Sequence, residues 1–421
     1  MKIAFIVDEF PCLSQTFVLN QIVGLIKMGY DVHVFAEKKG SDIKTHDDYK
    51  KYDLLNKTYY YCIPKNIMFR LLKGLFFIIK YTPRNHKVVF RSLNIFRYKR
   101  KAWSFHLLFL SIPFIERRPF DIIHCQFGTL GLKAVLLRQI GAINCKIVTS
   151  IRGFDVTMIL KEKPGVYHEL FRVGDFFLPV CQSLKERLVH AGCDKMKIAI
   201  HYSGIDCSKF EYSPRRRIND EYIMLLTVAR LVEKKGVAYA IEAVASLISK
   251  GKKIVYTIVG DGMLRENLQQ IIARLGIEQQ VKLIGWKTQE EVKILLQKSH
   301  VLVAPSLTSA SGDQEGIPNV IKEAMASGLP VISTFHSGIP ELVTDGVTGI
   351  LVPEKEIHSL ADALAYLISH PEICNKMGKS GRKYIEENFD INKLNNTLVQ
   401  IYQQLLGKKA ADNLTFKKEN L

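Results

Sequence analysis

The 421-residue chain lacks paired cysteines. Its eight cysteines are scattered, and no two of them form a Cys-x-x-Cys pair, so the sequence offers neither a zinc motif nor a disulfide framework. Five of the eight lie in or beside apolar stretches, which favours buried and reduced thiols. The cysteine pattern therefore indicates a protein of a reducing compartment.

Long uncharged apolar runs are missing as well. No stretch reaches the roughly 18 residues that a membrane-spanning helix needs. The N-terminus, MKIAFIVDEF, places a single lysine before a short apolar run that two acids close. This pattern predicts a first β-strand and not a signal peptide, so we expect a cytoplasmic protein.

Acidic residues are scarce between positions 61 and 120. This segment holds thirteen Lys or Arg residues and one acid, Glu116, so it carries +12 of the chain's net charge of +18. The basic residues alternate with apolar and aromatic ones, which favours helices that lie on the inner membrane surface. Two surface helices with solvated basic faces would give a similar pattern. Nucleic acid is not indicated, because no motif for binding it accompanies the charge.

Short apolar runs alternate with amphipathic helical patterns in both halves of the chain. The first half predicts a helix over 16–27 and strands at 3–7, 31–36, 121–124, 146–150, 176–180 and 197–201. The second half predicts helices over 237–249, 264–275 and 289–298 and strands at 222–228, 253–259, 281–284 and 301–304. Strands joined by helices predict an α/β fold of two facing Rossmann-like lobes, with a ligand cleft between them.

The two halves are separated by a polar segment without periodicity. Residues 208–221 contain Pro214 and read as a linker. It divides a first lobe, residues 1–207, from a second lobe, residues 222–385. We expect a helix over 386–407 to pack back toward the first lobe and a polar tail to follow over 408–421.

The most informative stretch is residues 315–331, EGIPNVIKEAMASGLPV. Pro318 suits the first turn of a helix and Gly328 suits its C-terminal end, so Glu315 precedes this helix and Glu323 lies inside it. A helix N-terminus favours phosphate, and the two carboxylates can accept hydrogen bonds from sugar hydroxyls. For either glutamate taken alone, a structural role explains the residue better: Glu323 as a solvated helix residue and Glu315 as a partner of the helix dipole.

The spacing Glu-x(7)-Glu followed by Ala-Met-Ala-x-Gly-x-Pro-Val resembles the signature of the family-four retaining glycosyltransferases, which have the GT-B fold. The resemblance implies that Glu315 contacts the transferred sugar and that Glu323 binds the ribose of a nucleotide-sugar donor. Three neighbours of Glu315 are then also expected in the donor site: Asp313, Gly316 and Ile317.

A second block lies earlier in the second half. Residues 228–236, VARLVEKKG, are similar to the family's Gly-Arg-Leu-x-x-x-Lys-Gly motif, with Ala in the first Gly position. The resemblance implies that Arg230 and Lys235 neutralise the donor diphosphate, although ordinary surface cations would also fit the pattern. It further implies that Gly262, in a Gly-x-Gly turn, and Trp286, beside the base, belong to the donor site.

The first lobe resembles the exopolysaccharide and colanic-acid branch of that family. Residues 10–18, FPCLSQTFV, are similar to the relatives' Phe-Pro-x-x-Ser-Glu-Thr-Phe, with Gln15 in place of the acid. Ser14 and Thr16 are therefore expected on the acceptor side of the cleft. A plain strand-to-helix turn with Thr16 as its cap is equally compatible with the residues.

Residues 148–155, VTSIRGFD, are similar to the family segment Thr-x-His-Gly-x-Asp, with Arg152 where the His usually stands. An arginine cannot act as a base, so Arg152 would instead hold the leaving phosphate or an acidic group. Asp155 is expected on the acceptor side. His124, at the end of another strand, is a further catalytic candidate, although a lone histidine there is often structural.

No Asp-x-Asp pair occurs, and metal-dependent glycosyltransferases commonly use that pair to hold a cation on the diphosphate. We therefore expect no metal or other cofactor. The resemblance implies a UDP- or GDP-linked hexose as the donor. The acceptor would be a lipid-linked oligosaccharide at the inner face of the plasma membrane. Two alternatives stay open: a nucleotide-sugar epimerase of the same fold and a non-catalytic, membrane-associated binding protein.

Overall fold

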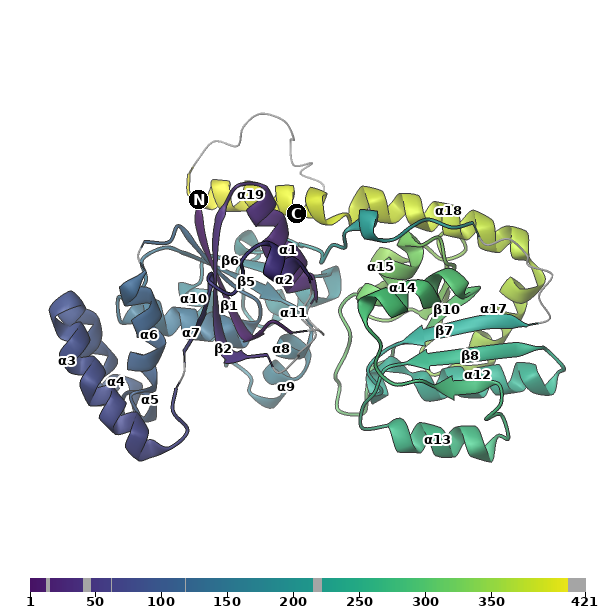
Figure 1. The fold of residues 1–421 in the computed structure, drawn as a ribbon, viewed down its shortest axis with the longest axis horizontal. Helices are drawn as coiled ribbons and strands as arrows, with labels where there is room; N and C mark the ends of the chain where they lie inside the picture. The colour runs from purple at the N-terminus through teal and green to yellow at the C-terminus, as the bar shows by residue number, and fades with distance from the viewer. Residues whose placement is uncertain (13–15, 41–46, 62, 118, 215–221, 408–421) are drawn as a thin grey trace.

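The computed structural model describes residues 1–12, 16–40, 47–61, 63–117, 119–214 and 222–407. These residues form two lobes, each built on a six-stranded parallel sheet (Figure 1). The strand order is β3-β2-β1-β4-β5-β6 in the first sheet and β12-β11-β10-β7-β8-β9 in the second. Both sheets therefore share one topology, and the predicted α/β fold of two Rossmann-like lobes is confirmed.

The strands of the first sheet are β1 (Lys2–Phe10), β2 (Asp31–Lys39), β3 (Thr58–Tyr60), β4 (Ile122–Cys125), β5 (Lys146–Ile151) and β6 (Phe176–Pro179). Those of the second are β7 (Ile223–Val228), β8 (Ile254–Val259), β9 (Val281–Leu283), β10 (Val301–Ala304), β11 (Val331–Thr334) and β12 (Ile350–Val352). Helices cover both faces of each sheet, so the central strands are buried on both sides and consist largely of apolar residues.

The helices of the first lobe are α1 (Thr16–Lys27), α2 (Asp47–Lys51), α3 (Ile67–Ser92), α4 (Ile95–Tyr98), α5 (Arg100–Trp103), α6 (His106–Glu116), α7 (Gly128–Gln139), α8 (Phe154–Thr157), α9 (Ile159–Glu162), α10 (His168–Val173) and α11 (Gln182–His190). Those that follow are α12 (Val237–Ser249), α13 (Arg265–Arg274), α14 (Gln289–Lys298), α15 (Asn319–Ala326), α16 (Ile339–Leu342), α17 (Ile357–Ser369), α18 (Pro371–Asn388) and α19 (Ile391–Leu405).

The strand predicted at 197–201 is wrong. A short 3₁₀ turn occupies Lys195–Lys197, and a single bridge between Phe177 and Ile198 is all that joins the segment to β6. The N–H groups of Ala199 and His201 do donate to β6 carbonyls. The next return bond of a parallel ladder would need an N–H from Pro179, which proline lacks, so the ladder stops after one bridge.

The last two helices connect the lobes. α18 packs against α15 of the second lobe, whereas α19 shares the core of the first lobe with β1 and α1 (Figure 1). The break between them lies at Phe389 and Asp390, and the Asp390 side chain accepts the N–H groups of Asn392 and Lys393 to begin α19. The chain thus returns to its first lobe at residue 391.

A group of helices, α3 to α6, stands at the outer edge of the first lobe, on the side away from the second sheet (Figure 1). α3 has 26 residues, and non-helical backbone at Asn85, just after Pro83, kinks it. Its inner side packs against α6. None of the helices in the described part of the chain combines the length and hydrophobicity that crossing a bilayer requires.

Candidate active site between the lobes

The loops that carry most of the predicted donor residues leave neighbouring strands. β7 and β10 lie side by side where the strand order of the second sheet reverses, and residues 229–236 and 305–318 follow their carboxyl ends. Ligands of such sheets bind at this point. The two loops are joined directly, because Leu307 N–H donates to the Lys234 carbonyl and Ala310 N–H donates to the Glu233 carboxylate, each over 2.9 Å.

Glu315 lies in a compact cluster of charges. Its carboxylate is 3.0 Å from Nζ of Lys235 and 3.3 Å from Nζ of Lys234, and all three side chains are largely buried. Burial by itself would raise the pKa of Glu315, but the two ammonium groups outweigh it and lower the pKa to about 2. Glu315 is therefore an ionised hydrogen-bond acceptor at neutral pH, beside two cations.

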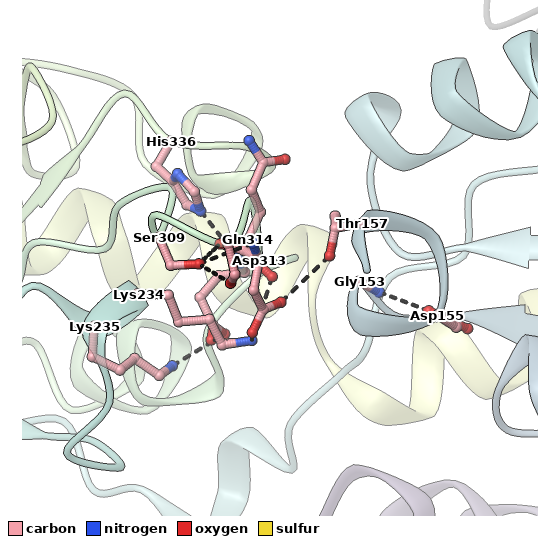
Figure 2. Close-up of polar contacts among 11 residues, drawn as sticks. Gly153, Asp155, Thr157, Lys234, Lys235, Ser309, Asp313, Gln314 and His336 are labelled. Atoms are coloured by element: carbon pink, nitrogen blue, oxygen red, sulfur yellow. Dashed lines mark hydrogen bonds and ion pairs between the residues drawn. The ribbon is translucent and has the colours of Figure 1, made fainter. Parts of the chain in front are cut away.

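Lys234 is a member of this cluster that the sequence did not reveal. Besides Glu315, its ammonium group contacts the Asp313 carboxylate at 2.9 Å and the Gln314 carbonyl oxygen at 3.4 Å (Figure 2). Lys234 therefore holds three successive residues of the loop. The only sequence signal was its position next to Lys235, and the 3₁₀ turn at Glu233–Lys235 brings both lysines to the same loop.

His336 is the second member that sequence reasoning missed. The backbone N–H of Glu315 donates to Nε2 of His336 over 3.0 Å, and Nδ1 of His336 contacts the Glu354 carboxylate at 2.5 Å. The imidazole is fully buried. Glu354 also accepts the Thr308 N–H, so one carboxylate steadies both ends of the loop that carries Glu315. No motif marks His336, which reaches the site only because β11 lies beside β10.

The predicted ribose-binding residue, Glu323, is half-buried on α15. Burial raises the pKa of its carboxyl, and the neighbouring Lys322 acts in the opposite direction. Lys322 is fully buried and donates to the Ser203 carbonyl oxygen at 2.5 Å, so it joins α15 to the last residues of the first lobe. α15 begins directly after Pro318 and is followed by Gly328 with a positive φ of 74°, as the residue pattern predicted.

Three other predicted donor residues follow the carboxyl ends of β7, β8 and β9. Arg230 is exposed just after β7. Gly262 has no room for a side chain, since an added Cβ would lie 2.5 Å from the Leu231 carbonyl oxygen. Trp286 is 60% exposed after β9. The carboxyl edge of the second sheet therefore carries a cation at Arg230, a turn at Gly262 where the backbone is closely packed, and an aromatic ring at Trp286.

Gly316 and Ile317 lie where the lobes touch. An added Cβ at Gly316 would stand 2.9 Å from a Val180 methyl group and 3.3 Å from the Arg152 carbonyl oxygen, both in the first lobe. Ile317 packs at the margin of apolar clusters of both lobes. The structure therefore places these two predicted donor residues in the contact between the lobes, and Gly316 permits the approach because it has no side chain.

In the first lobe, Asp155 organises the loop after β5. Its buried carboxylate accepts the N–H groups of Gly128, Arg152 and Gly153 over 3.0, 3.1 and 3.1 Å. Burial raises the pKa of this carboxyl, while the backbone donors lower it. Asp155 thus fixes the backbone of the loop that faces the second lobe, instead of presenting a free carboxylate to the cleft (Figure 2).

Arg152 is held by neutral partners. Its Nη1 donates to Ser203 Oγ at 2.6 Å, its Nη2 donates to Gln126 Oε1 at 2.5 Å, and its guanidinium lies 4.0 Å over the Phe17 ring. Burial lowers the pKa of Arg152 to about 9, so it stays protonated at neutral pH. The buried Nε atom has no hydrogen-bond partner among the described residues.

His124 does not face the cleft. It is fully buried, with Nδ1 2.6 Å from the Tyr402 hydroxyl and Nε2 2.8 Å from Ser150 Oγ. Burial lowers the pKa of His124 well below its ordinary value, so the ring is neutral. Thr16 is the half-buried first residue of α1, and Ser14 lies outside the described residues.

Direct contacts join the two lobes around this site. Thr157 donates to the Asp313 carboxylate at 3.4 Å (Figure 2). Lys161 donates to the Ser311 carbonyl oxygen at 2.8 Å, and Arg187 donates to Gln314 Oε1 at 2.7 Å. Beside them lies a groove of about 1020 Å³ that is lined from both lobes, by Thr157, Lys161, Arg187, Thr308 and Gln314 among others. The loop of Glu315 is therefore bordered by the first lobe on one side and by an open groove on another.

Lysine side chains supply positive charge beside Glu315. Lys234 and Lys235 lie within 3.3 Å of Glu315. In the described part of the chain, no three His, Cys, Asp or Glu side chains are grouped in a way that would hold a metal ion.

Known families match both lobes. A model described as Glycosyltransferase Family 4 matches residues 14–209, and one described as Glycosyl transferases group 1 matches residues 208–384. WcaL of Salmonella typhimurium, assigned as a glycosyltransferase of colanic acid biosynthesis, is 35% identical over 96% of this chain and 100% of its own. The amylovoran biosynthesis glycosyltransferase AmsK of Erwinia amylovora is 36% identical with the same coverage.

More distant proteins are similar to this chain in structure or in sequence. The crystal structure of Anabaena Alr3699/HepE in complex with UDP and glucose covers 96% of this chain and 100% of its own, with a TM-score of 0.71 and 17% identity. An Escherichia coli UDP-Gal:α-D-GlcNAc-diphosphoundecaprenol α-1,3-galactosyltransferase is 25% identical over 70% of this chain and 78% of its own. The likeness to the solved Alr3699/HepE structure confirms the expected GT-B arrangement of two Rossmann-like lobes.

Proposed function

The chain belongs to the family-four, group 1 glycosyltransferases, and we propose that it transfers a hexose from a UDP- or GDP-linked donor to a lipid-linked oligosaccharide, with retention of anomeric configuration. It is a glycosyltransferase of exopolysaccharide biosynthesis, as its full-length likeness to WcaL and AmsK indicates. The observation that carries the donor assignment is the cluster of Glu315, Lys234 and Lys235 between the lobes.

In this proposal the diphosphate binds near Arg230 and Lys235, and Glu323 accepts hydrogen bonds from the ribose. The complex of Alr3699/HepE with UDP and glucose supports a uridine nucleotide. Charge develops on the leaving diphosphate as the bond to the sugar breaks, and fixed cations in a partly buried site stabilise that charge most strongly in the transition state. Lysine and arginine side chains would then do what a metal ion does in other transferases.

The proposed transfer step keeps the anomeric configuration in a single displacement. The acceptor hydroxyl attacks the anomeric carbon on the face that the diphosphate leaves, and the departing phosphate oxygen takes the hydroxyl proton. One C–O bond to phosphate breaks and one C–O bond to the acceptor forms, so the products are a glycoside and a nucleoside diphosphate. Glu315 orients the sugar, and contact between the lobes excludes water from the reaction.

The acceptor is the less constrained half of the proposal. The galactosyltransferase that acts on a diphosphoundecaprenol-linked sugar supports a lipid-linked acceptor. Such an acceptor requires the enzyme to work at the cytoplasmic face of the plasma membrane. We therefore also propose peripheral association with that surface, through the basic segment 61–120.

Donor binding tests the proposal most directly. Calorimetry with a panel of UDP-, GDP-, ADP- and CDP-sugars in EDTA should show one tight donor, and Lys235→Ala should abolish its binding. Lys252→Ala, which removes an exposed lysine of the same lobe, is the matched control and should change nothing. Binding that needs added Mg²⁺ or Mn²⁺ would overturn the metal-free part of the proposal.

Glu315→Ala distinguishes an enzyme from a binding protein. The variant should fold and lose sugar transfer, because the sugar loses its orienting carboxylate. Glu278→Ala, at an exposed position of the same lobe, should keep full transfer. Transfer that survives Glu315→Ala unchanged would contradict the catalytic assignment of this loop.

A further inference from the structure

The outward side of α3 is an apolar surface. Met68, Leu72, Leu75, Phe76 and Ile79 are exposed by 69, 62, 53, 58 and 77%. At 100° per residue they fall within one third of the helix circumference, directly opposite the buried positions Gly74 and Tyr81. We call these five residues the outer face of α3.

The inner side of the same helix already has its partners. Tyr81 lies in a small core with Leu108 and Ile112 of α6, and Phe77 packs against it. A Cβ at Gly74 would stand 2.2 Å from the Phe105 ring, so the helix is seated closely on its own lobe. The outer face is therefore additional to what folding of the lobe requires. Monomeric soluble proteins rarely leave so continuous an apolar surface in water.

Positive charge borders the outer face. Lys73, Lys80 and Arg84 lie along one flank of the helix, between the outer face and the buried side. Two more exposed aromatic residues lie among basic residues in α4 and α5: Phe96, which is 99% exposed, and Trp103, which is 58% exposed. An apolar stripe with a cationic flank is complementary to a lipid surface of negative charge.

The same charge disfavours a second copy of this chain as the occupant. Segment 61–120 has a net charge of +12, so a symmetric contact through the outer face would bring two such segments together. Like charges at an interface oppose association. An anionic lipid surface, in contrast, supplies both the apolar contact and the opposite charge.

We propose that the outer face of α3 inserts at the boundary between headgroups and acyl chains of an anionic membrane, with the helix lying in the membrane plane. This inference rests on the proposed function, because it names the surface that holds the enzyme at its lipid-linked acceptor. The inference assigns membrane insertion to the apolar residues of the outer face. The basic residues on its flank contribute by attraction to anionic headgroups.

Vesicle co-sedimentation of the full chain tests the proposal. Vesicles of equal parts phosphatidylcholine and phosphatidylglycerol should bind the protein, and vesicles of phosphatidylcholine alone should bind it at least about tenfold more weakly. The double variant Leu72→Glu/Ile79→Glu should lose binding to the anionic vesicles by more than about tenfold. Ile294→Glu/Val347→Glu, which adds the same charge at exposed apolar sites of the second lobe, should bind as the unchanged protein does.

Donor binding is measured on the same variants and separates this inference from the proposed function. If Leu72→Glu/Ile79→Glu loses vesicles but still binds the nucleotide-sugar, both proposals stand. The membrane-docking proposal is overturned if the unchanged protein does not bind anionic vesicles. It is also overturned if the outer-face variant and the control variant bind these vesicles equally. Both conclusions hold whatever the result of the donor-binding measurement. A dimer in solution that Leu72→Glu/Ile79→Glu disrupts, without vesicle binding, would also overturn it and assign the face to a second copy.

Discussion

The backbone N–H of Glu315 donates to Nε2 of His336 over 3.0 Å. Because Nε2 accepts this bond, the imidazole proton lies on Nδ1, where the Glu354 carboxylate receives it. A histidine in this tautomer fixes the backbone of the residue that is proposed to orient the sugar. His336 therefore acts through Glu315 and is a positioning residue.

His336→Ala should lower kcat/KM by about 10- to 100-fold, because the loop would lose the acceptor that holds the Glu315 backbone. Binding of UDP without a sugar should change little, since the diphosphate cations do not depend on this bond. Steady-state kinetics and calorimetry measure the two effects. Glu354→Gln, which keeps a neutral acceptor for Nδ1, should have a smaller effect, and equal losses in both variants would contradict the positioning role.

The low pKa of Glu315 predicts a pH-dependent contribution to stability. Its folded-state pKa of about 2 lies below the ordinary value of 4.5, so the stabilisation is complete above pH 4.5 and disappears as the pH falls toward 2. The protein should exceed Glu315→Gln in free energy of unfolding by roughly 1–3 kcal/mol at neutral pH. Urea unfolding of both proteins at stepped pH measures the difference, and a difference that does not shrink on acidification would show that the charge pairs are not its source.

The contacts between the lobes predict a conformational effect. Lys161→Ala/Arg187→Ala removes two of the bonds to the loop of residues 311–314. The lobes should then separate more readily, which should raise the radius of gyration in solution scattering and increase hydrolysis of the donor relative to transfer. Lys163→Ala, at an exposed lysine of the first lobe, serves as the control for charge, and an unchanged ratio of hydrolysis to transfer in the double variant would reject the role of these bonds.

Gly236 and Gly276 form a matched pair for testing the loop after β7. Their φ angles are 64° and 66°, but an added Cβ at Gly236 would stand 1.9 Å from the Pro305 carbonyl oxygen, whereas nothing lies within 4 Å of one at Gly276. Gly276→Ala should cost about 1 kcal/mol from backbone strain alone. Gly236→Ala should cost at least about 2 kcal/mol more and weaken donor binding, because the loops that hold Lys235 and Glu315 must move apart. Equal costs in chemical unfolding would show that the two loops are not closely packed.

Much of the fold could be predicted because local patterns agree with it. The helices at 16–27, 237–249 and 289–298 and the strand at 301–304 occupy the expected residues. The three-residue strand β3 was too short to give a signal. The segment at 197–201 has the short apolar run of a strand, Ile-Ala-Ile, between Lys197 and His201. It fails to form a strand because Pro179, in β6, cannot donate the next ladder hydrogen bond.

The candidate site also combines residues that a local pattern predicts with residues that only the fold brings into place. Glu315, Arg230 and Lys235 could be predicted as donor-site candidates because a motif fixes their spacing, and the structure brings Glu315 and Lys235 to 3.0 Å. His336 carries no motif, since only the order of parallel strands places its loop beside Glu315. His124 stands at a strand end, where a cleft residue is expected, yet its partner Tyr402 lies 278 residues away in the chain. A sequence does not show which face of a strand a distant helix will cover.

The return of α19 to the first lobe has a consequence for synthesis. β1 and α1 leave the ribosome among the first residues, but the core that they form also contains Leu398, Val399, Ile401 and Tyr402. The first lobe therefore cannot complete its core until residue 402 has emerged, after the second sheet has been made. The half that is translated first is the half that matures last, and its unfinished apolar surface is exposed to chaperones for most of the time that translation takes.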